Sequence, residues 1–304
     1  MFRSIFRPIA SRLLVAVVIT ASMHAAVAAD AVAAQVQLSI IKTAEAHTLE
    51  ALTYSGGGYT KRVKLQHVAV LVRHPQGTVL FDTGLGRQVD AQVKADMPLW
   101  ARPLFAAFGP VLAARSQLDA AGVPPIGRIV LSHVHWDHAS GLVDFPEAQV
   151  WLPQQERDFM AHPNYLAVFP SQVSAPTIQW KPFQWENKPY EGFAQSLDLF
   201  GDASVVLVPL PGHTPGSTGM YVSLRSGKKF LFVGDAVWRA DAIAPKRPKM
   251  WISSMVVDSD AAQTLKAVAT LADLQAATPG LVIVPAHDAD VHDAMDAYFP
   301  KSVQ

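Results

Sequence analysis

The sequence predicts an α+β fold made of short strands and helices, and three observations support this prediction. Half of the residues are hydrophobic and only 16% are charged, which is enough apolar side chain to bury a sizeable core. Short apolar runs bounded by glycine, proline and polar residues recur along the chain, as expected of strands separated by turns. Several of these runs end directly in a histidine or an aspartate, which is typical of a site assembled at strand ends.

The first residues have the features of a secretory signal peptide. Three arginines precede an apolar run at 13–22 and the small-residue cleavage sequence Ala26-Val27-Ala28. An uncleaved membrane anchor is the alternative, but the run is too short to span a bilayer comfortably. We therefore expect residues 1–29 to be removed and residues 30–304 to form a single domain that is periplasmic or secreted.

Composition excludes several classes of partner and site. Without the three leader arginines the 25 basic residues fall to 22, against 25 acidic residues, so a nucleic-acid partner is not expected. The chain has no cysteine, so neither disulfides nor thiolate metal ligands contribute. After the leader no apolar stretch approaches the roughly 18 residues of a membrane helix. We expect no membrane contact after signal cleavage.

The first part of the mature chain is predicted to form three strands, at 37–41, 65–73 and 78–81. The sequence His74-Pro75-Gln76-Gly77 has turn composition, so the last two strands are predicted to form a hairpin. His67 lies within the second of these strands and is interpreted as an ordinary strand side chain.

The hairpin leads into Asp82-Thr83-Gly84, an acid and a glycine at a strand end, and then into an apolar segment at 92–118 that contains Trp100 and Phe105. Three prolines interrupt this segment, so it cannot be one straight helix. It is interpreted as a short helical excursion that could form a lid, a substrate wall or the contact of a homodimer. Ordinary core is the alternative.

A dense cluster of metal-binding side chains follows the short strand predicted at 128–132. The stretch Ser132-His-Val-His-Trp-Asp-His-Ala-Ser-Gly141 holds three imidazoles and a carboxylate within six residues. Imidazole nitrogen and carboxylate oxygen are donors that Zn²⁺ and similar ions accept. The alternation of His133, His135 and Asp137 suits an extended or turning backbone rather than the helical zinc signature. A surface or core cluster of histidines is the plainer alternative, and the density of donors favours a metal.

The rest of the chain repeats the pattern of strand, loop and donor. Three later strands lead to His213, Asp235 and His287 in turn, whereas His292 lies in the last predicted helix and is expected to be exposed and uninvolved. A proline-rich and aromatic segment at 163–193 could line a pocket or form a packed surface loop. The remaining strands are predicted at 149–152, 204–208, 220–224, 229–233 and 281–284, and helices at 156–162, 258–276 and 290–298.

The number of donors distinguishes one ion from two. A single catalytic zinc needs three protein ligands and a water, whereas a two-metal site needs about seven donors, one of which bridges the ions. The sequence offers seven candidates: His133, His135, Asp137, His138, His213, Asp235 and His287. We therefore expect two divalent ions, with zinc first and manganese, iron or cobalt as alternatives.

The motif His133-x-His135-x-Asp137-His138, followed in order by Gly212-His213, Gly234-Asp235 and Ala286-His287, resembles the metallo-β-lactamase superfamily over nearly all of the mature chain. The resemblance implies an αβ/βα four-layer sandwich, in which two mixed β-sheets pack face to face, helices cover the outer faces and the metals lie at one edge. Asp82 matches an early family motif in which the acid supports a metal ligand from behind.

The resemblance also implies a role for each donor. One ion would be held by His133, His135 and His213 and the other by Asp137, His138 and His287, with Asp235 bridging them. A hydroxide shared by the ions would be the nucleophile. Asp137 could also accept and return a proton, so Asp137 and Asp235 are the candidate catalytic residues.

Within the superfamily, residues 132–141 are similar to the motif of the N-acyl-homoserine-lactone lactonases. This similarity implies a binuclear metallohydrolase that opens a lactone or a related small hydrophobic ester and would act in quorum quenching. The candidate substrate pocket comprises Trp238, Trp136, Trp100 and Phe105, with the aromatic segments 97–108 and 159–193 as an apolar wall.

Trp238 stands where those lactonases usually have a tyrosine, and an indole can donate a hydrogen bond but cannot release its proton as a phenol can. An aryl-ester or organophosphate (phosphotriester) hydrolase of the same superfamily is therefore the alternative, and a noncatalytic metal-binding protein is a third, less favoured one. The basic loop with Lys246, Arg247 and Lys249 is interpreted as solvated.

Overall fold

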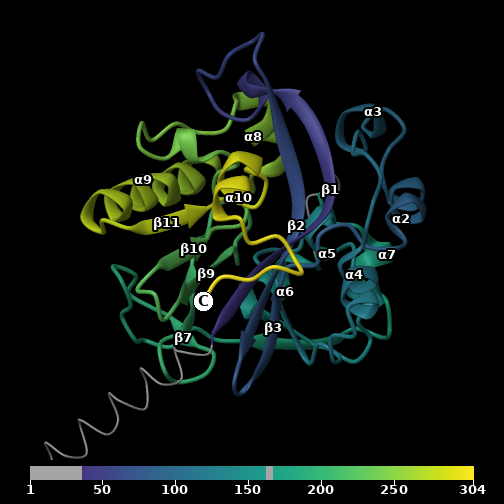
Figure 1. Cartoon of the computed structure of the whole chain (residues 1–304). Coiled ribbons are helices and arrows are strands. Elements are labelled where there is room, and N and C mark those ends of the chain that lie inside the picture. Colours follow the sequence, from purple (N-terminus) through teal and green to yellow (C-terminus); the bar gives the residue numbers. More distant parts are fainter. Residues whose placement is uncertain (1–35, 162–166) are drawn as a thin grey trace, which may run out of the picture.

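The computed structural model describes residues 36–161 and 167–304. The predicted signal peptide and part of the 163–193 segment lie outside these residues. Two β-sheets pack face to face, and helices cover their outer faces (Figure 1). The predicted α+β four-layer sandwich is therefore confirmed.

The first sheet has six strands in sequential order, antiparallel from β1 to β3 and parallel from β3 to β6. The predicted hairpin is present as β2 and β3, with Val70 opposite Phe81. The strands of this sheet are β1 (Gln37–Leu49), β2 (Arg62–His74), β3 (Gly77–Phe81), β4 (Arg128–Val130), β5 (Gln149–Pro153) and β6 (Gln179–Phe183).

The second sheet has five strands in the order β11-β10-β9-β8-β7, and only β10 and β11 run parallel. Because β8, β10 and β11 each end before a predicted donor, this sheet supplies the second half of the site. Its strands are β7 (Leu197–Asp198), β8 (Val205–Pro209), β9 (Thr218–Ser223), β10 (Lys229–Phe232) and β11 (Leu281–Val284).

Alternation along the strands builds three apolar layers. Between the sheets, Val70 of β2 belongs to the same buried cluster as Leu207 of β8. On the outer face of the first sheet, Leu71 packs in a cluster with Leu118 of helix α4 (Ala114–Ala120). On the outer face of the second sheet, Leu231 packs with helix α9 (Ala261–Ala277). These layers hold the loops at the sheet edge in place.

The remaining helices are short. The proline-broken 92–118 segment forms the short helix α3 (Arg102–Phe105) between α2 (Val89–Asp96) and α4, as the predicted helical excursion. Helix α8 (Trp251–Val257) is one that the sequence pattern did not indicate. The others are α5 (Trp136–Ala139), α6 (Gln154–Phe159), α7 (Pro170–Val173), α10 (Ala289–Met295) and the 3-10 turns η1 (Glu50–Leu52), η2 (Leu142–Asp144) and η3 (Ala240–Ala242).

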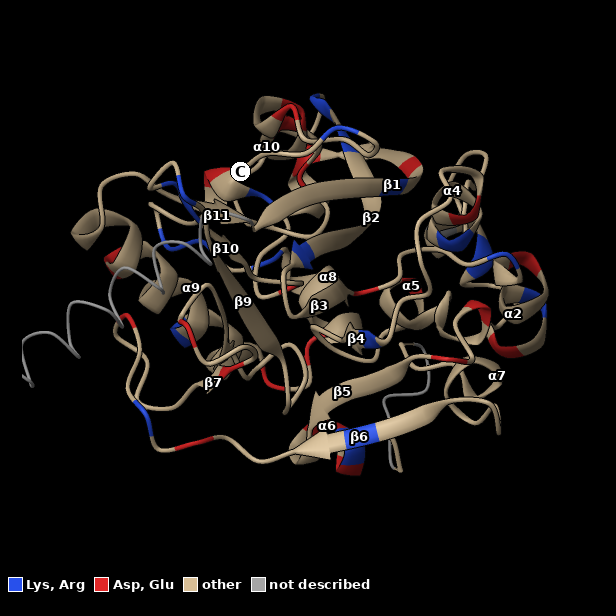
Figure 2. Ribbon diagram, turned by 60° about the horizontal axis from the view of Figure 1, so that its bottom comes forward, with Lys and Arg blue, Asp and Glu red and all other residues tan. Residues whose placement is uncertain are grey.

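Most charged residues lie in loops and helices, but several strands also carry them, among them β6 with Lys181, whereas β5 and β9 carry none (Figure 2). Among the residues that the structure describes, no helix is both long and apolar enough to cross a bilayer.

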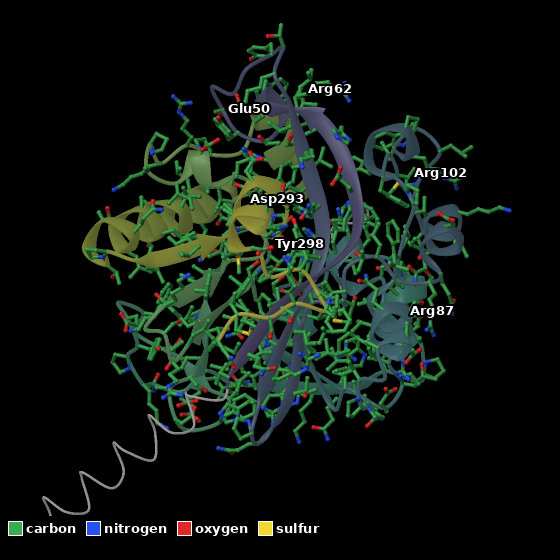
Figure 3. All side chains as sticks on the ribbon, viewed as in Figure 1. Glu50, Arg62, Arg87, Arg102, Asp293 and Tyr298 are labelled. Carbon is green, nitrogen blue, oxygen red and sulfur yellow. The ribbon has the colours of Figure 1, made fainter. Side chains whose placement is uncertain are left out.

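The prediction that His292 is exposed is wrong. Helix α10 packs against β2, so the ring is fully buried, with its nitrogens 2.9 Å from Gln66 Oε1 and 3.0 Å from the carbonyl oxygen of Pro285. Burial lowers the pKa of His292 to about 4 and keeps the ring neutral. Figure 3 shows Asp293 and Tyr298 close together beside β2, where the Tyr298 hydroxyl oxygen lies 2.6 Å from Asp293 Oδ1 and 2.9 Å from Gln66 Oε1.

Candidate metal centre

All seven predicted donors lie at one edge where the two sheets meet. The backbone N–H of Thr218, at the start of β9, donates to the carbonyl oxygen of Ser132 over 2.8 Å and ties the sheets together there. The backbone at His135 is extended, as predicted, but the chain then turns into α5, so Asp137 and His138 stand on one turn of helix. Ligand atoms within 4.8 Å of one another form three groups: His133, His135 and His213; His133, His138 and Asp235; and His67, Asp137 and His287.

The first group is the first ligand set that the family resemblance implies. The second implied set is also brought together, since Asp137 Oδ2 is 3.3 Å from His287 Nε2 and 3.8 Å from His138 Nε2. The structure adds His67, whose Nδ1 lies 3.3 Å from Asp137 Oδ2. The interpretation of His67 as an ordinary strand side chain was therefore incomplete.

The spacing of the donors fits divalent ions. Two ligands at 2.0–2.1 Å from one tetrahedral ion stand about 3.3 Å apart. His213 Nε2 is 3.2 Å from His133 Nε2, and His138 Nε2 is 3.3 Å from Asp235 Oδ1. His135 Nε2, His138 Nε2 and Asp235 Oδ1 are buried without a hydrogen-bond partner, which would be costly in a site that held no cation.

In three of the histidines the Nδ1 atom, which is not directed at the other donors, is held by a neighbouring carboxylate or a backbone carbonyl. His138 Nδ1 is 2.8 Å from Asp82 Oδ2, and His213 Nδ1 is 2.8 Å from Asp258 Oδ1. His287 Nδ1 is 2.9 Å from the carbonyl oxygen of Gln66 on β2. Because these acceptors take a proton on Nδ1, the lone pair of each Nε2 is directed toward the other donors, as metal binding requires.

Burial and mutual contact set the charges of the centre. Burial lowers the pKa of His133 and of His135 well below its usual value, so both rings are neutral. Burial alone would raise the pKa of Asp235, but His287 and His138 hold it well below its usual range. The neutral rings of His133 and His135 and the ionised carboxylate of Asp235 are therefore in the forms that bind a cation.

Asp82 supports the central loop from the end of β3. Its carboxylate accepts hydrogen bonds from the backbone N–H and the hydroxyl of Ser132, each over 2.7 Å, in addition to facing His138. Its φ of 59° is in the left-handed region, a strain that clusters at functional sites. Gly234 allows the Asp235 loop to come close, because a Cβ at Gly234 would lie 2.8 Å from Ser132 Cβ.

Asp235 lies between the two groups of histidines. Its Oδ1 is 3.1 Å from His287 Nε2, and its Oδ2 is 3.6 Å from His213 Nε2. Oδ2 also accepts a 2.8 Å hydrogen bond from the indole N–H of Trp238. The indole N–H is therefore used to hold this carboxylate.

The interpretation of the basic loop as solvated is correct for Lys246 and Arg247 but wrong for Lys249. Lys249 is buried, and its ammonium donates to the backbone carbonyl of Asp235 over 2.6 Å and to Asp258 Oδ1 over 2.9 Å. Burial would raise the pKa of Asp258, but Lys249 and His213 hold it below its usual range. A buried ion pair thus stands behind His213.

Glu156, in helix α6, connects the loop that carries His133 and His135 with the turn that carries His213. It is fully buried, and its two oxygens accept hydrogen bonds from the backbone N–H of Val134, over 2.8 Å, and of Gly216, over 2.9 Å. A side chain at Gly216 would collide with Glu156, because its Cβ would lie 2.5 Å from the glutamate Cβ. Glu156 therefore fixes the spacing of the His133–His135 segment from the turn that carries His213.

Glu156→Gln is expected to cost more stability at pH 5 than at pH 7.5 in the metal-free protein. Burial raises the pKa of Glu156 from 4.5 to about 7, although the two backbone N–H groups act against the rise. Between pH 4.5 and about pH 7 the folded state binds a proton on Glu156 that the unfolded state has lost. The contribution of Glu156 to the free energy of unfolding therefore falls as the pH rises through this range, by at most about 3 kcal/mol. Glutamine does not titrate, and urea unfolding of both proteins at both pH values isolates the difference. A cost that is equal at the two values, or larger at pH 7.5, contradicts this reasoning.

A cavity of about 390 Å³ opens onto the centre. Of the predicted pocket residues, Trp238, Trp136 and Phe105 line it. Trp100 does not, because its side chain points into solvent and is 66% exposed, so that prediction is wrong.

The wall of the cavity also differs from the predicted one. Of the described part of 159–193, only Ala167 reaches the cavity. A large part of the wall comes instead from the end of β1, from Leu52 in η1 and from Ile252 and Val257 in α8. These segments are distant from the metal motif in sequence, and no local pattern marked them.

The chain matches known proteins of one family. A model of the metallo-beta-lactamase superfamily matches residues 62–287. A probable metallo-hydrolase of Mycobacterium bovis is 29% identical over 75% of this chain and 76% of its own. The N-acyl homoserine lactonase AttM of Rhizobium radiobacter is 25% identical over 72% of this chain and 81% of its own.

A solved structure shares the fold: an N-acyl homoserine lactone hydrolase with the product N-hexanoyl-L-homoserine bound at its catalytic metal center. It aligns with a TM-score of 0.68 and 17% identity, over 88% of this chain and 98% of that one. Because the family model spans most of the sequence and includes all seven predicted donors, this chain belongs to the metallo-β-lactamase superfamily.

Proposed function

We propose that this metallo-hydrolase holds two divalent ions and opens uncharged lactones with an apolar acyl chain, N-acyl homoserine lactones first among them. The observation that carries the proposal is the chemistry of the cavity. Among the described residues that line it there is no lysine and no arginine, and its only carboxylates are Asp137 and Asp235. The part of a substrate that lies away from the ions must therefore be nearly uncharged, because an anion there would be buried without a partner.

The residues that line the cavity form a floor beside the metal centre and an apolar wall. Asp137, Asp235, His135 and His287 lie at the floor of the cavity. The wall beyond them is mainly aliphatic and aromatic, with a few uncharged polar side chains such as Thr53 and Ser253. An acyl chain on the wall would bring the scissile carbonyl to the donors and exclude water from the reacting bond.

The ligand sets follow the contacts already described. His133, His135 and His213 would hold one ion, and Asp137, His138 and His287 the other, with Asp235 between them. When bound, divalent ions supply an ionised water near neutral pH and polarise the carbonyl oxygen. Asp137, partly open to the cavity, is placed to accept a proton from the attacking water and return it to the leaving oxygen. Superfamily members typically use zinc, so zinc is the first ion to test.

Lactone hydrolysis is supported by the relatives. AttM is an N-acyl homoserine lactonase, and the aligned structure holds the product N-hexanoyl-L-homoserine at its metal center. An acyl group of that kind is uncharged and apolar, as the cavity requires.

A substrate panel tests the proposal. We expect kcat/KM for N-acyl homoserine lactones to exceed that for acyl-coenzyme A thioesters, which are anionic, by at least about 100-fold. Lengthening the acyl chain should raise kcat/KM about threefold per methylene until the cavity is full. Treatment with a chelator should abolish turnover, and added zinc should restore it. Negligible lactone turnover by fully metallated protein would refute the lactonase proposal.

An aryl-ester or phosphotriester hydrolase is the second candidate, and Trp238 favours it. Its N–H is bound to Asp235, and no tyrosine is among the described residues that line the cavity. A substrate that needs no phenolic donor, and whose aromatic leaving group packs against Trp136 or Phe105, suits this arrangement. The same panel decides, because this candidate requires aryl esters or phosphotriesters to be the better substrates.

A further inference from the structure

We propose that His67 is a sixth imidazole ligand of the centre and binds, through Nδ1, the ion held by Asp137 and His287. The inference rests on the two-metal part of the proposed function and is independent of the substrate.

The fold directs His67 into the site. It lies on β2 on the same face as Ala69 and Leu71, the face on which α5 packs. The register between β1 and β2 shifts next to it, between Lys42 and Ala44, and Thr43 donates from its hydroxyl to the carbonyl oxygen of His67 over 2.8 Å. Such a bulge re-aims the neighbouring side chain and is common beside active sites.

The ring nitrogen of His67 has the spacing of a ligand. Its 3.3 Å separation from Asp137 Oδ2 equals that between His287 Nε2 and the same oxygen. It is also the spacing expected of two ligands on one ion, and it is longer than an ordinary N–H···O bond. His67, Asp137 and His287 together bring their donor atoms within 4.8 Å of one another.

The lack of a hydrogen bond separates His67 from the structural histidines. In the described ranges, the buried imidazole nitrogens without a hydrogen-bond partner are His67 Nδ1, His135 Nε2 and His138 Nε2. The last two belong to the ligand set of the family, whereas the nitrogens of His74 and His292 are hydrogen-bonded. A buried imidazole nitrogen that faces a carboxylate and a second imidazole without a hydrogen bond is placed as a cation ligand is.

The surroundings of the ring hold it in this orientation. Phe108 and Trp136 pack against it with ring centroids 6.3 and 6.0 Å away, and His287 lies at 5.2 Å. Because these rings fill the space around it, His67 cannot turn Nδ1 toward another acceptor without displacing them. An added neutral donor would tighten binding of this ion without changing the net charge of the site.

The test counts imidazole ligands in the cobalt-loaded protein. Each histidine bound to Co²⁺ contributes one exchangeable ring N–H proton with a strong paramagnetic shift, so the wild type should show six such signals and His67→Phe five. Chelator competition should show that the more weakly held ion is bound about 10- to 100-fold more weakly in the variant. His47→Gln is the matched control, because His47 lines the same cavity but is half exposed, and it should change neither readout.

Each outcome has a distinct meaning. Five signals in the wild type, or a His67→Phe protein with an unchanged signal count, overturns the inference even if its metal affinity falls, since His67 would then only hydrogen-bond Asp137. His67→Gln repeats the count if the phenylalanine variant does not fold. A wild type that binds only one ion per chain refutes the two-metal proposal itself.

Discussion

Asp235→Asn is expected to lower kcat/KM by at least about 100-fold and to reduce bound metal from two ions per chain to about one. Asparagine keeps the shape of the side chain and can still accept the Trp238 hydrogen bond. It loses the negative charge between His138, His213 and His287. Two cations close together repel each other, so a neutral amide should not hold both.

The measurement pairs metal analysis after dialysis with steady-state kinetics in excess zinc. Asp273→Asn is the control, because Asp273 pairs with Lys246 at the surface and should leave both values unchanged. If Asp235→Asn retained two ions and wild-type kcat/KM, Asp235 would not be the bridging ligand.

The ligand set could be predicted from the sequence because its logic is local. Four donors fall within His133–His138, and the others each follow a strand that its apolar composition reveals. Strand ends meet at a sheet edge, so even separated donors converge. The hairpin and most of the strands were predictable for the same reason, since the pattern within a strand is a short-range signal. The division of the strands into two sheets was implied only by the family resemblance.

The supporting residues could not be predicted, because their role depends on contacts far along the chain. His67 is 70 residues from Asp137, and Glu156 reaches Val134 and Gly216 from a helix of its own. Nothing in a single sequence separates a strand histidine with free solvent access from one that faces a carboxylate. The cavity wall was misplaced for the same reason, since α8 carries no motif.

The basic loop shows this limit most clearly, because two lysines three residues apart have opposite environments. Lys246 is half exposed and pairs with Asp273 at the surface, whereas Lys249 is buried between Asp258 and the backbone of Asp235. In the sequence the two lysines carry the same charge and belong to the same basic loop. Only the packing of the loop on the centre distinguishes them, and it provides a matched pair for an experiment.

Lys249→Met is expected to lower the unfolding free energy by about 3 to 5 kcal/mol, because it leaves the buried Asp258 carboxylate without its cation. It should also weaken metal binding, since Asp258 holds the ring of His213 and Lys249 holds the backbone of Asp235. Lys246→Met removes the same charge from the same loop and should change the unfolding free energy by no more than about 0.5 kcal/mol. Urea unfolding of the metal-free proteins measures the unfolding free energies of the two variants.

The double variant Lys249→Met/Asp258→Asn separates the charge from the positioning. With neither charge buried, the unfolding free energy should recover toward the wild-type value, as buried pairs often do when both partners are replaced. Metal affinity should stay low, because the amide in place of the Asp258 carboxylate no longer orients His213 through a charge-assisted hydrogen bond, and Asp235 still lacks the Lys249 contact. Recovery of both quantities would mean that the ion pair contributes stability alone, and recovery of neither would mean that the ammonium acts through Asp235 rather than through Asp258.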